Sequence, residues 1–532
     1  MSTNAFARRR IVGITVPLFS LRTDDGWGIG EIPDLADFGR FAHGLGARLV
    51  QLLPLGEISG GETSPYGALS AFGIDPMYIG WRGHPDLPED EWASLLGEDG
   101  VRTVAWLRAQ PGVDYQAVRW LKDRALRAAH ARFAARELAT DSPRARDFRA
   151  FIEDNAAWLL PYATFRALKD ANGQRAWWDW DGAVRDSVEA AVARARATEG
   201  AALERYQYAQ WVAHTQWRVA RRALHDLEVE VMGDLPFMVG KDSADVWAHR
   251  AEFKEETLVG APGDQFNEEG QEWGLPPYKW SVMRENGFWW LRARAGYAAS
   301  LYDRFRIDHL VGFYRTYQRP ADALRGPDGK LRPGFFDPAD EPAQKAHGEA
   351  VLSAMIEASR AHDADLVAED LGVIPDFVRP SLASLDVPGY KVLIWEQRDG
   401  RFHDPARYPA RSVACFSTHD TAPVSVWWEA LPDWEREAVC RLPGMSGRAL
   451  PPRFGPEVHA ALLDTILRAG SELVLLLAQE VLGDRARINT PSTVGAHNWT
   501  WRLPRTVATL LDDPETAASV ARVREAIARA GR

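Results

Sequence analysis

Short apolar runs rich in β-branched residues alternate along this chain with longer segments of helical periodicity. This alternation is typical of parallel strands joined by crossover helices. Eight strands are expected, at residues 11–16, 47–55, 228–237, 302–307, 364–369, 389–396, 412–417 and 472–479. A helix at residues 32–45 joins the first two strands. We therefore predict an α/β protein, a (β/α)8 TIM barrel with helical and irregular insertions between strands.

Some intervals between the expected strands are too long to be connecting loops. Between the second and third strands, helical patterns occupy residues 115–138, 146–169, 184–197 and 201–227. We predict a catalytic barrel formed by residues 1–80 and 201–532, and an inserted, mainly helical subdomain at residues 81–200. Within the barrel we expect a helical insertion at 424–470 and a substrate-loop insertion at 239–284. The second is rich in Gly, Pro and aromatic residues, and such long loops commonly contact substrate.

Composition limits the classes of partner. The net charge is −11, and Lys and Arg are dispersed rather than gathered into a basic stripe or a polybasic anchor, so nucleic acid and membrane partners are not expected. The apolar run at 473–478 is far shorter than the roughly 20 residues that span a bilayer. Cys415 and Cys440 lack the spacing of a disulfide framework or a metal site. We expect a cytoplasmic protein, either a monomer or a weak homo-oligomer.

Four carboxylates stand where expected strands end. They are Asp234, Asp308, Glu369 and Asp420. In β/α barrels, catalytic groups occupy the C-terminal ends of the strands. Cleavage of a glycosidic bond needs one group that protonates the leaving oxygen and another that attacks or stabilises the sugar carbon, and a pair of carboxylates provides both. The pattern therefore points to acid/base or glycosyl chemistry.

The neighbours of these carboxylates indicate possible roles. Arg306 alternates with Asp308 on the same face of a strand, so its guanidinium can keep Asp308 ionised as a nucleophile. Glu369 follows apolar residues and precedes Asp370, a setting that raises the pKa of a proton donor. His419 and Asp420 could bind sugar hydroxyls.

Other interpretations of the same residues are possible. An isolated Arg-x-Asp is most often a structural ion pair, and an isolated His-Asp is more often a cap than a site. The coincidence of several strand-end carboxylates, in barrel order, favours the functional interpretation. HExxH, paired Cys and EF-hand patterns are absent, so no catalytic metal is expected. The sequence also lacks a GxSxG elbow, and GWGIGEIPD fits a βα loop better than a dinucleotide fingerprint.

The chain resembles the 4-α-glucanotransferases, also called amylomaltases or disproportionating enzymes, which are relatives of the α-amylases. The resemblance runs nearly end to end. It is carried by the ordered strings PLFSLRTDDGWGIGEIPDL, LVQLLPL, SPYGALSAFGIDPMYI, GDLPFMVGKDSADVW, GAPGDQFNEEGQEWGLPPYKW, FRIDHLVGFYRTY, VAEDLGVIP, STHD and RINTPSTVGAHNWTWR.

This resemblance implies retaining transfer of α-1,4-glucan chains without a metal or organic cofactor. Asp308 would be the nucleophile, Glu369 the acid/base and Asp420 the transition-state stabiliser. The donors would be maltose, maltooligosaccharides or glycogen-like glucans. Sugar-binding roles are implied for Ser64, Tyr66, Asp75, Asp234, Trp273, Arg306, His309, His419 and Asn489, and Asn498 also matches the family pattern.

Departures from the family pattern concern acceptor choice. Gln265 stands where many members have Tyr, and Ser492 replaces a common Gly. Two other functions remain open at this stage. An α-glucan hydrolase would use the same carboxylates with water as acceptor, and a non-catalytic glucan-binding protein would bind sugar without turnover.

Overall fold

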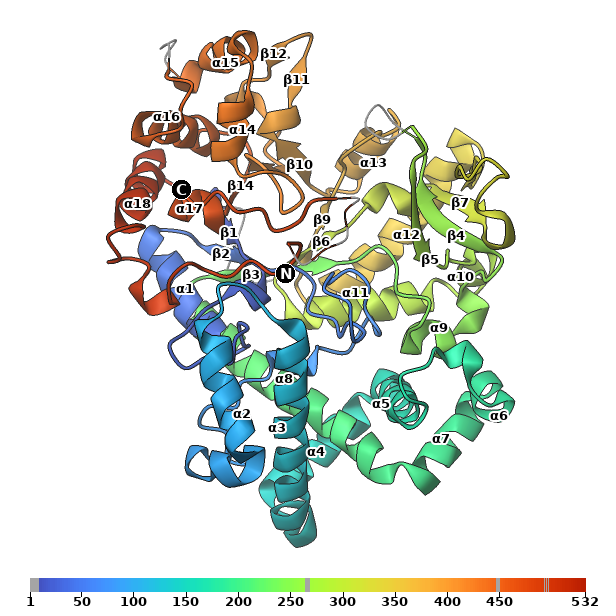
Figure 1. The fold of residues 1–532 in the computed structure, drawn as a ribbon. Coiled ribbons are helices and arrows are strands. Elements are labelled where there is room, and N and C mark those ends of the chain that lie inside the picture. Colours follow the sequence, from blue (N-terminus) through green and yellow to red (C-terminus); the bar gives the residue numbers. More distant parts are fainter. Residues whose placement is uncertain (1–8, 264–267, 446–449, 492, 494, 496) are drawn as a thin grey trace.

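The computed structural model describes residues 9–263, 268–445, 450–491, 493, 495 and 497–532. Eight parallel strands form a closed barrel in the order β1-β14-β13-β10-β9-β6-β3-β2 (Figure 1). They are β1 (Ile11–Thr15), β2 (Leu49–Gln51), β3 (Glu230–Leu235), β6 (Arg304–Ile307), β9 (Asp365–Ala368), β10 (Gly389–Val392), β13 (Ser412–Cys415) and β14 (Leu473–Leu477). Each lies within one of the eight predicted strands, so the predicted (β/α)8 barrel is confirmed.

Apolar residues fill both sides of the barrel wall. On β14, Leu473 and Leu475 belong to the cluster inside the barrel, whereas Val474 and Leu476 belong to the layer between barrel and helices. Gly13 of β1 faces inward, where a Cβ atom would lie 2.7 Å from side-chain atoms of both Leu49 and Leu475. The interior is therefore a filled core, and chemistry is confined to the barrel mouth.

Helices cover the outside of the barrel. Those that follow barrel strands or lead into them are α1 (Asp34–Leu45), α8 (Gly200–His225), α11 (Trp289–Leu301), α12 (Glu341–Arg360), α13 (Val378–Ser384), α16 (Pro456–Leu467), α17 (Ala478–Leu482) and α18 (Ala517–Ala530). Helix α1 matches the predicted helix at 32–45. It buries Leu35, Phe38 and Leu45 on one face and ends at Gly46, which has a left-handed φ of 89°.

Further helices separate β2 from β3 and project from one side of the barrel (Figure 1). They are α2 (Trp92–Ala109), α3 (Tyr115–Arg136), α4 (Pro143–Asp154), α5 (Ala156–Ala171), α6 (Gly182–Asp186) and α7 (Val188–Thr198). The predicted helix at 146–169 is two helices that meet at Asn155. The one at 184–197 is divided at Ser187, whose side chain accepts from the N–H of Ala190 and so starts α7. The division into a barrel and a subdomain at 81–200 stays a prediction.

The segment 239–284 contains more regular structure than expected. It holds α9 (Ala244–Ala248), β4 (Thr257–Ala261), β5 (Gln271–Leu275) and α10 (Trp280–Glu285). Its two strands join β7 (Thr316–Pro320) and β8 (Phe335–Asp337), which follow β6, in an antiparallel sheet of order β5-β4-β7-β8. This second sheet brings Trp273 of β5 toward the end of β6.

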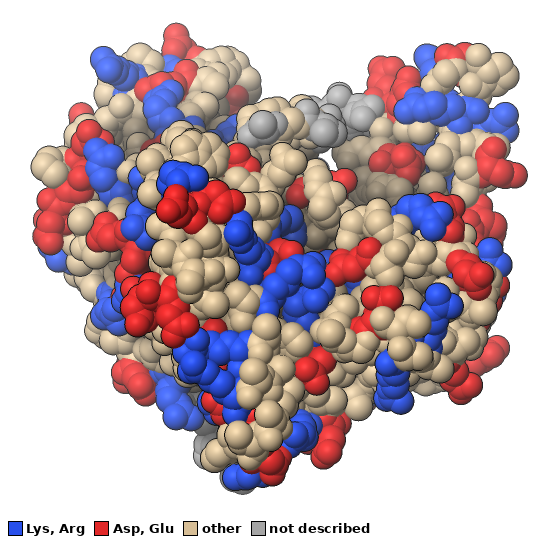
Figure 2. Space-filling view, turned by 60° about the horizontal axis from the view of Figure 1, so that its bottom comes forward, with Lys and Arg blue, Asp and Glu red and all other residues tan. Residues whose placement is uncertain are grey.

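The remaining elements lie between β10 and β14. They are the hairpin strands β11 (Gln397–Arg398) and β12 (Arg401–Phe402), and the helices α14 (Val424–Ala430) and α15 (Asp433–Cys440). Acidic and basic side chains are interspersed on the face shown in Figure 2. None of the helices in the described part of the chain combines the length and the apolar character that crossing a bilayer requires.

Candidate active site

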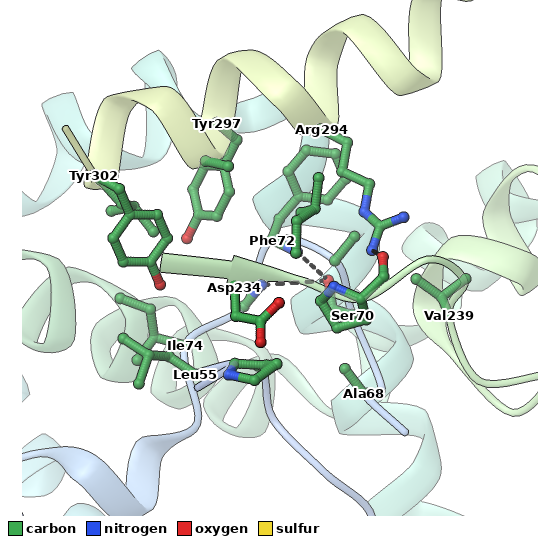
Figure 3. Close-up of a pocket in the computed structure, with 18 of the residues that line it drawn as sticks. Leu55, Ala68, Ser70, Phe72, Ile74, Asp234, Val239, Arg294, Tyr297 and Tyr302 are labelled. Carbon is green, nitrogen blue, oxygen red and sulfur yellow. Dashed lines mark hydrogen bonds between the residues drawn. The ribbon is translucent and has the colours of Figure 1, made fainter. Parts of the chain in front are cut away.

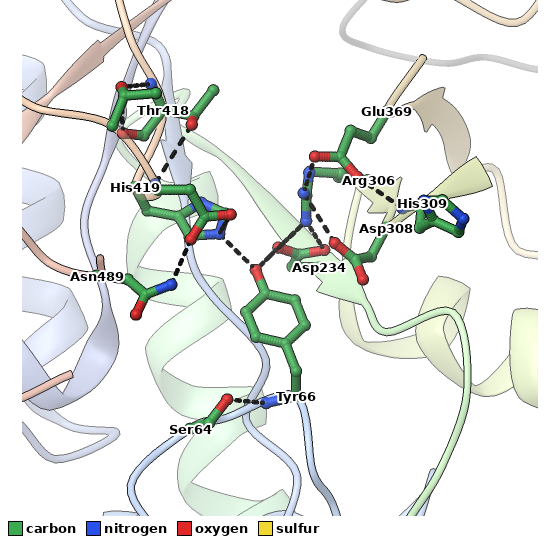
Figure 4. A network of polar contacts seen from close by, with 12 residues as sticks. Ser64, Tyr66, Asp234, Arg306, Asp308, His309, Glu369, Thr418, His419 and Asn489 are labelled. Atoms are coloured by element: carbon green, nitrogen blue, oxygen red, sulfur yellow. Dashed lines mark hydrogen bonds and ion pairs between the residues drawn. The ribbon is translucent and has the colours of Figure 1, made fainter. Parts of the chain in front are cut away.

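Neighbouring strands bring three of the predicted carboxylates to one place at the barrel mouth (Figure 4). Asp234 of β3 is in register with Arg306 of β6, and Ile307 of β6 is in register with Ala368 of β9. Asp308 follows Ile307 in the chain, and Glu369 follows Ala368. Their backbone N–H groups donate to Leu235 (3.0 Å) and Ile307 (3.1 Å), so the barrel hydrogen bonding extends to both side chains.

Arg306 is the centre of the site. Its side chain is only 4% exposed. Nη1 donates to both carboxylate oxygens of Asp234, at 2.7 and 2.6 Å, while Nη2 contacts Oδ1 of Asp308 at 2.9 Å and Oε1 of Glu369 at 2.7 Å. Because these last two oxygens share one nitrogen, they lie at most two hydrogen-bond lengths, about 6 Å, apart. A short distance between these oxygens is compatible with the carboxyl separation of about 5 to 5.5 Å that retaining enzymes have.

A chain of polar side-chain contacts connects Asp420 to the same site. The Tyr66 hydroxyl donates to Oδ2 of Asp234 at 2.8 Å and lies 3.0 Å from Nε2 of His419. Oδ2 of Asp420 lies 3.4 Å from that same nitrogen, and Nδ2 of Asn489 donates to its Oδ1 at 2.7 Å. Asp420 is therefore held from two sides, with 36% of its side chain exposed.

Two other predicted residues complete the side of the site nearest Asp308 and Glu369. His309 has a left-handed φ of 42°, unusual for a residue other than Gly, and its N–H donates to Oε2 of Glu369 at 2.6 Å. Its ring meets the Trp273 ring edge to face, with centroids 4.9 Å apart. Burial lowers the pKa of His309 to about 4, so the imidazole is neutral at pH 7.

Ser64 and Asp75 belong to the loop that carries Tyr66. Ser64 Oγ accepts from the N–H of Tyr66 at 3.4 Å. The Asp75 carboxylate is fully buried and accepts from the N–H groups of Ile58 and Met77, at 3.2 and 3.0 Å, and from Arg119 at 2.9 Å. It contacts none of the catalytic carboxylates in these interactions, but ties together the two ends of the loop that positions Tyr66.

The electrostatics correct two expectations for the ligand-free site. Burial raises the pKa of Asp308 well above its usual range, and Glu369, Asp234 and Asp420 raise it further against the effect of Arg306. Burial also acts to raise the pKa of Glu369, but Arg306 and the N–H of His309 outweigh it and lower that pKa. The two pKa shifts are thus opposite in direction to the ones expected, because Arg306 is shared and Glu369 has the additional backbone donor.

The expected effect of Asp370 on Glu369 was also wrong. Asp370 accepts from Nε of Arg379 at 2.9 Å and from the N–H of Tyr390 at 2.7 Å, so it secures β10 to β9 instead.

Sequence reasoning missed the polar floor of the site. Thr15 donates to Oε1 of Gln51 at 2.7 Å, and Nε2 of Gln51 donates to the Tyr390 hydroxyl at 3.1 Å. All three line a small cavity together with Arg306, Glu369 and His419. One sequence feature could have predicted this floor: two apolar strands each end in a polar residue, Thr15 of β1 and Gln51 of β2.

Two positions singled out for acceptor choice, Gln265 and Ser492, lie outside the described residues. Among the residues that the structure describes, no group of three or more His, Cys, Asp or Glu side chains is arranged to hold a metal ion.

Comparison with known proteins places this geometry in a family. A 4-alpha-glucanotransferase family model matches residues 16–508. The 4-alpha-glucanotransferase of Thermus thermophilus is 32% identical over 493 residues, covering 90% of this chain and 92% of that protein. The one from Chlamydia caviae is 29% identical over 522 residues, covering 96% and 93%. The amylomaltase of Streptococcus agalactiae, solved with acarbose, superposes with a TM-score of 0.81 at 25% identity, covering 98% of this chain and all of that one. The chain belongs to the 4-alpha-glucanotransferase family.

Proposed function

We propose that this enzyme transfers α-1,4-glucan segments from a maltooligosaccharide or glucan donor to a glucose or glucan acceptor by retaining double displacement. The observation that carries the mechanism is the single Arg306 nitrogen shared by Asp308 and Glu369. It keeps the two carboxyl groups close together, as direct attack of one of them on the sugar carbon requires. The Streptococcus agalactiae amylomaltase was solved in complex with acarbose, which supports an oligosaccharide-like ligand for this chain.

In the first step, Asp308 attacks the anomeric carbon of the donor and Glu369 protonates the departing glycosidic oxygen. A glycosyl ester with Asp308 results, and the shortened donor leaves. In the second step, Glu369 takes the proton from an acceptor hydroxyl, which attacks the same carbon and frees Asp308. Both steps invert the carbon, so the new linkage is again α.

The pKa shifts bear on the first step. Burial and the neighbouring carboxylates raise the pKa of the nucleophile Asp308, whereas Arg306 and the N–H of His309 lower the pKa of the acid Glu369. The first step needs Asp308 ionised and Glu369 protonated. We expect a bell-shaped dependence of kcat/KM on pH, governed by the pair as a unit.

The other residues bind and orient the sugar. Asp420, steadied by Asn489 and His419, would stabilise the transition state through hydroxyl groups of the sugar. Arg306, His309, Tyr66, Ser64 and Asp234 would fix the nucleophile and the reacting sugar, and Trp273 would contribute an aromatic face. Asp75 would act indirectly, through the loop that it ties. We further propose a cytoplasmic protein, a monomer or weak homo-oligomer, that needs no cofactor.

Incubation with maltotriose tests the proposed function. Transfer yields glucose together with oligosaccharides longer than maltotriose. Glucose and maltose without longer chains would instead establish the hydrolase. No turnover of maltotriose or of longer glucans, with binding retained, would establish a non-catalytic glucan-binding protein.

A further inference from the structure

A second hollow lies on the outer wall of the barrel. Its main cavity, of about 510 Å³, is bounded by α5, α9, α11 and the C-terminal end of α12. This volume falls within the range of small-molecule sites, roughly 300 to 1,000 Å³. A second cavity of about 320 Å³ adjoins it, because Ala248 and His249 line both. Together they form a groove around His249 that suits an elongated ligand.

Fixed aromatic rings line this groove. Trp289 is 43% exposed, and its Nε1 donates to Oε1 of Glu252 at 3.0 Å, which holds the indole in place. His249 contacts the Trp289 ring edge to face at 5.1 Å. Further along, Trp158 stacks with Phe72 and contacts Tyr297, with centroids 6.1 and 5.5 Å apart. Exposed, immobilised aromatic faces are suited to the flat apolar faces of sugar rings.

The groove also contains polar groups without protein partners. Glu252 is 4% exposed, and its Oε2 has no hydrogen-bond partner among the described residues. Burial raises the pKa of this carboxyl. Burial lowers the pKa of His249, whose imidazole makes no hydrogen bond within the described part of the chain. A carboxyl oxygen and a neutral imidazole offer both acceptors and a donor to a ligand rich in hydroxyl groups.

The charges around the groove argue against an anionic ligand. Arg185 and Arg250 both pair with Asp186, at 2.7 and 3.0 Å, and Arg292 pairs with Glu357 at 2.8 Å. These guanidinium groups are already engaged by carboxylates, and Glu252 would repel a phosphate or a carboxylate. Aromatic faces combined with neutral hydrogen-bonding capacity match a neutral polyhydroxylated chain.

We propose that this groove is a second glucan-binding site, which holds a polymeric substrate while its chain end reacts at Asp308. The proposal rests on the proposed function for the identity of the sugar. Ser70, Phe72 and Tyr297 line both the groove and the small cavity next to Asp234, so these side chains lie between the two. Figure 3 shows them around the small cavity. A glucan retained in the groove raises the effective concentration of chain ends at the barrel mouth.

The test compares Trp289→Ala with Trp120→Ala, a control on α3 with a similarly exposed indole (45%) that does not line the groove. Each variant is first shown to melt cooperatively, like the wild type. Binding to glycogen is then measured by affinity electrophoresis, and turnover is measured with both maltotriose and glycogen. Trp289→Phe, which keeps a ring but loses the N–H, serves as the conservative replacement.

We expect Trp289→Ala to weaken glycogen binding by about tenfold, the effect of removing an aromatic anchor, and to raise KM for glycogen. Its turnover of maltotriose should equal that of wild type and of Trp120→Ala, and Trp289→Phe should recover most of the binding. Glycogen binding unchanged in Trp289→Ala, or reduced equally in Trp120→Ala, would overturn the groove assignment. Failure of the wild type to disproportionate maltotriose would instead refute the proposed function, whatever the binding result.

Discussion

Strand β6 carries an arginine near each end, and the two arginines differ in the number of carboxylates that they contact. At the N-terminal end, Arg304 donates to Glu230 at 2.6 Å. Nearby carboxylates are also matched by cations, since Glu472 pairs with Arg411 at 2.6 Å and Asp303 with Arg221 at 2.6 Å. At the C-terminal end, Arg306 contacts Asp234, Asp308 and Glu369 together.

This difference separates stability from chemistry. Where buried charges balance, the ion pairs are structural, and removing one partner leaves the other uncompensated. Where three carboxylates contact one guanidinium, negative charge is in excess, and burial together with the neighbouring carboxylates raises the pKa of Asp308. Such an arrangement costs stability and provides the perturbed pKa values that catalysis uses. Substitutions at the two ends should therefore have opposite consequences.

The largest effect is expected for Asp308→Asn at the C-terminal end. An amide cannot form the glycosyl ester, so disproportionation should fall by at least about 10⁴-fold. The melting temperature should not fall, since Arg306 keeps Asp234 and Glu369 as partners. Product analysis with maltotriose and a thermal melt measure both. Residual transfer above a hundredth of wild type, in a preparation free of contaminating enzyme, would assign the nucleophile to another residue.

Glu369→Gln should follow, with a loss of roughly 10² to 10⁴-fold, the usual contribution of general acid/base assistance. A maltooligosaccharide donor with a good leaving group needs no proton from Glu369. The glycosylation step, measured by release of that leaving group, should therefore recover more than turnover of maltotriose does. Equal losses with both donors would contradict the acid assignment.

At the N-terminal end, Glu230→Gln should leave catalysis intact and reduce stability. The Glu230 side chain is 4% exposed and that of Arg304 is 9% exposed, so the substitution strands a buried guanidinium. A loss of about 3 kcal/mol in the free energy of unfolding is expected, measured by urea denaturation. The rate per folded molecule with maltotriose should remain within about twofold of wild type. A large fall in that rate would mean that the two ends are not separable.

The smallest effect is a pH dependence of stability. The pKa of Asp308 is raised in the folded protein. Its protonation therefore stabilises the fold below its ordinary pKa of 3.8, and this contribution to the free energy of unfolding is lost as the pH rises through the raised pKa. Asp308→Asn cannot undergo this loss. The melting temperature of the variant minus that of wild type should become more positive from pH 4 to pH 8, by about 1–3 °C. A difference that becomes more negative would place an ionised Asp308 in the free enzyme.

The barrel could be predicted from the sequence because most of its strands lie in apolar runs that alternate with helical segments. The antiparallel sheet could not, since β4, β5, β7 and β8 come from two separate segments. Their pairing depends on contacts that no local pattern records.

The candidate site shows the same limit. Arg-x-Asp in FRIDH correctly predicted the contact between Arg306 and Asp308, at 2.9 Å. It could not show that Asp234 and Glu369 share the guanidinium, or that His309 adopts a left-handed conformation that directs its N–H to Glu369. The directions of the pKa shifts depend on those partners, so they required the fold.

The anomeric configuration of newly formed linkages tests the central claim most directly. Asp308 and Glu369 contact the same nitrogen of Arg306, an arrangement that favours double displacement over inversion. Proton NMR of the maltooligosaccharides formed from maltotriose, recorded before the products re-equilibrate, should show new linkages that are all α-1,4. New β linkages at the transferred sugar would contradict double displacement through Asp308.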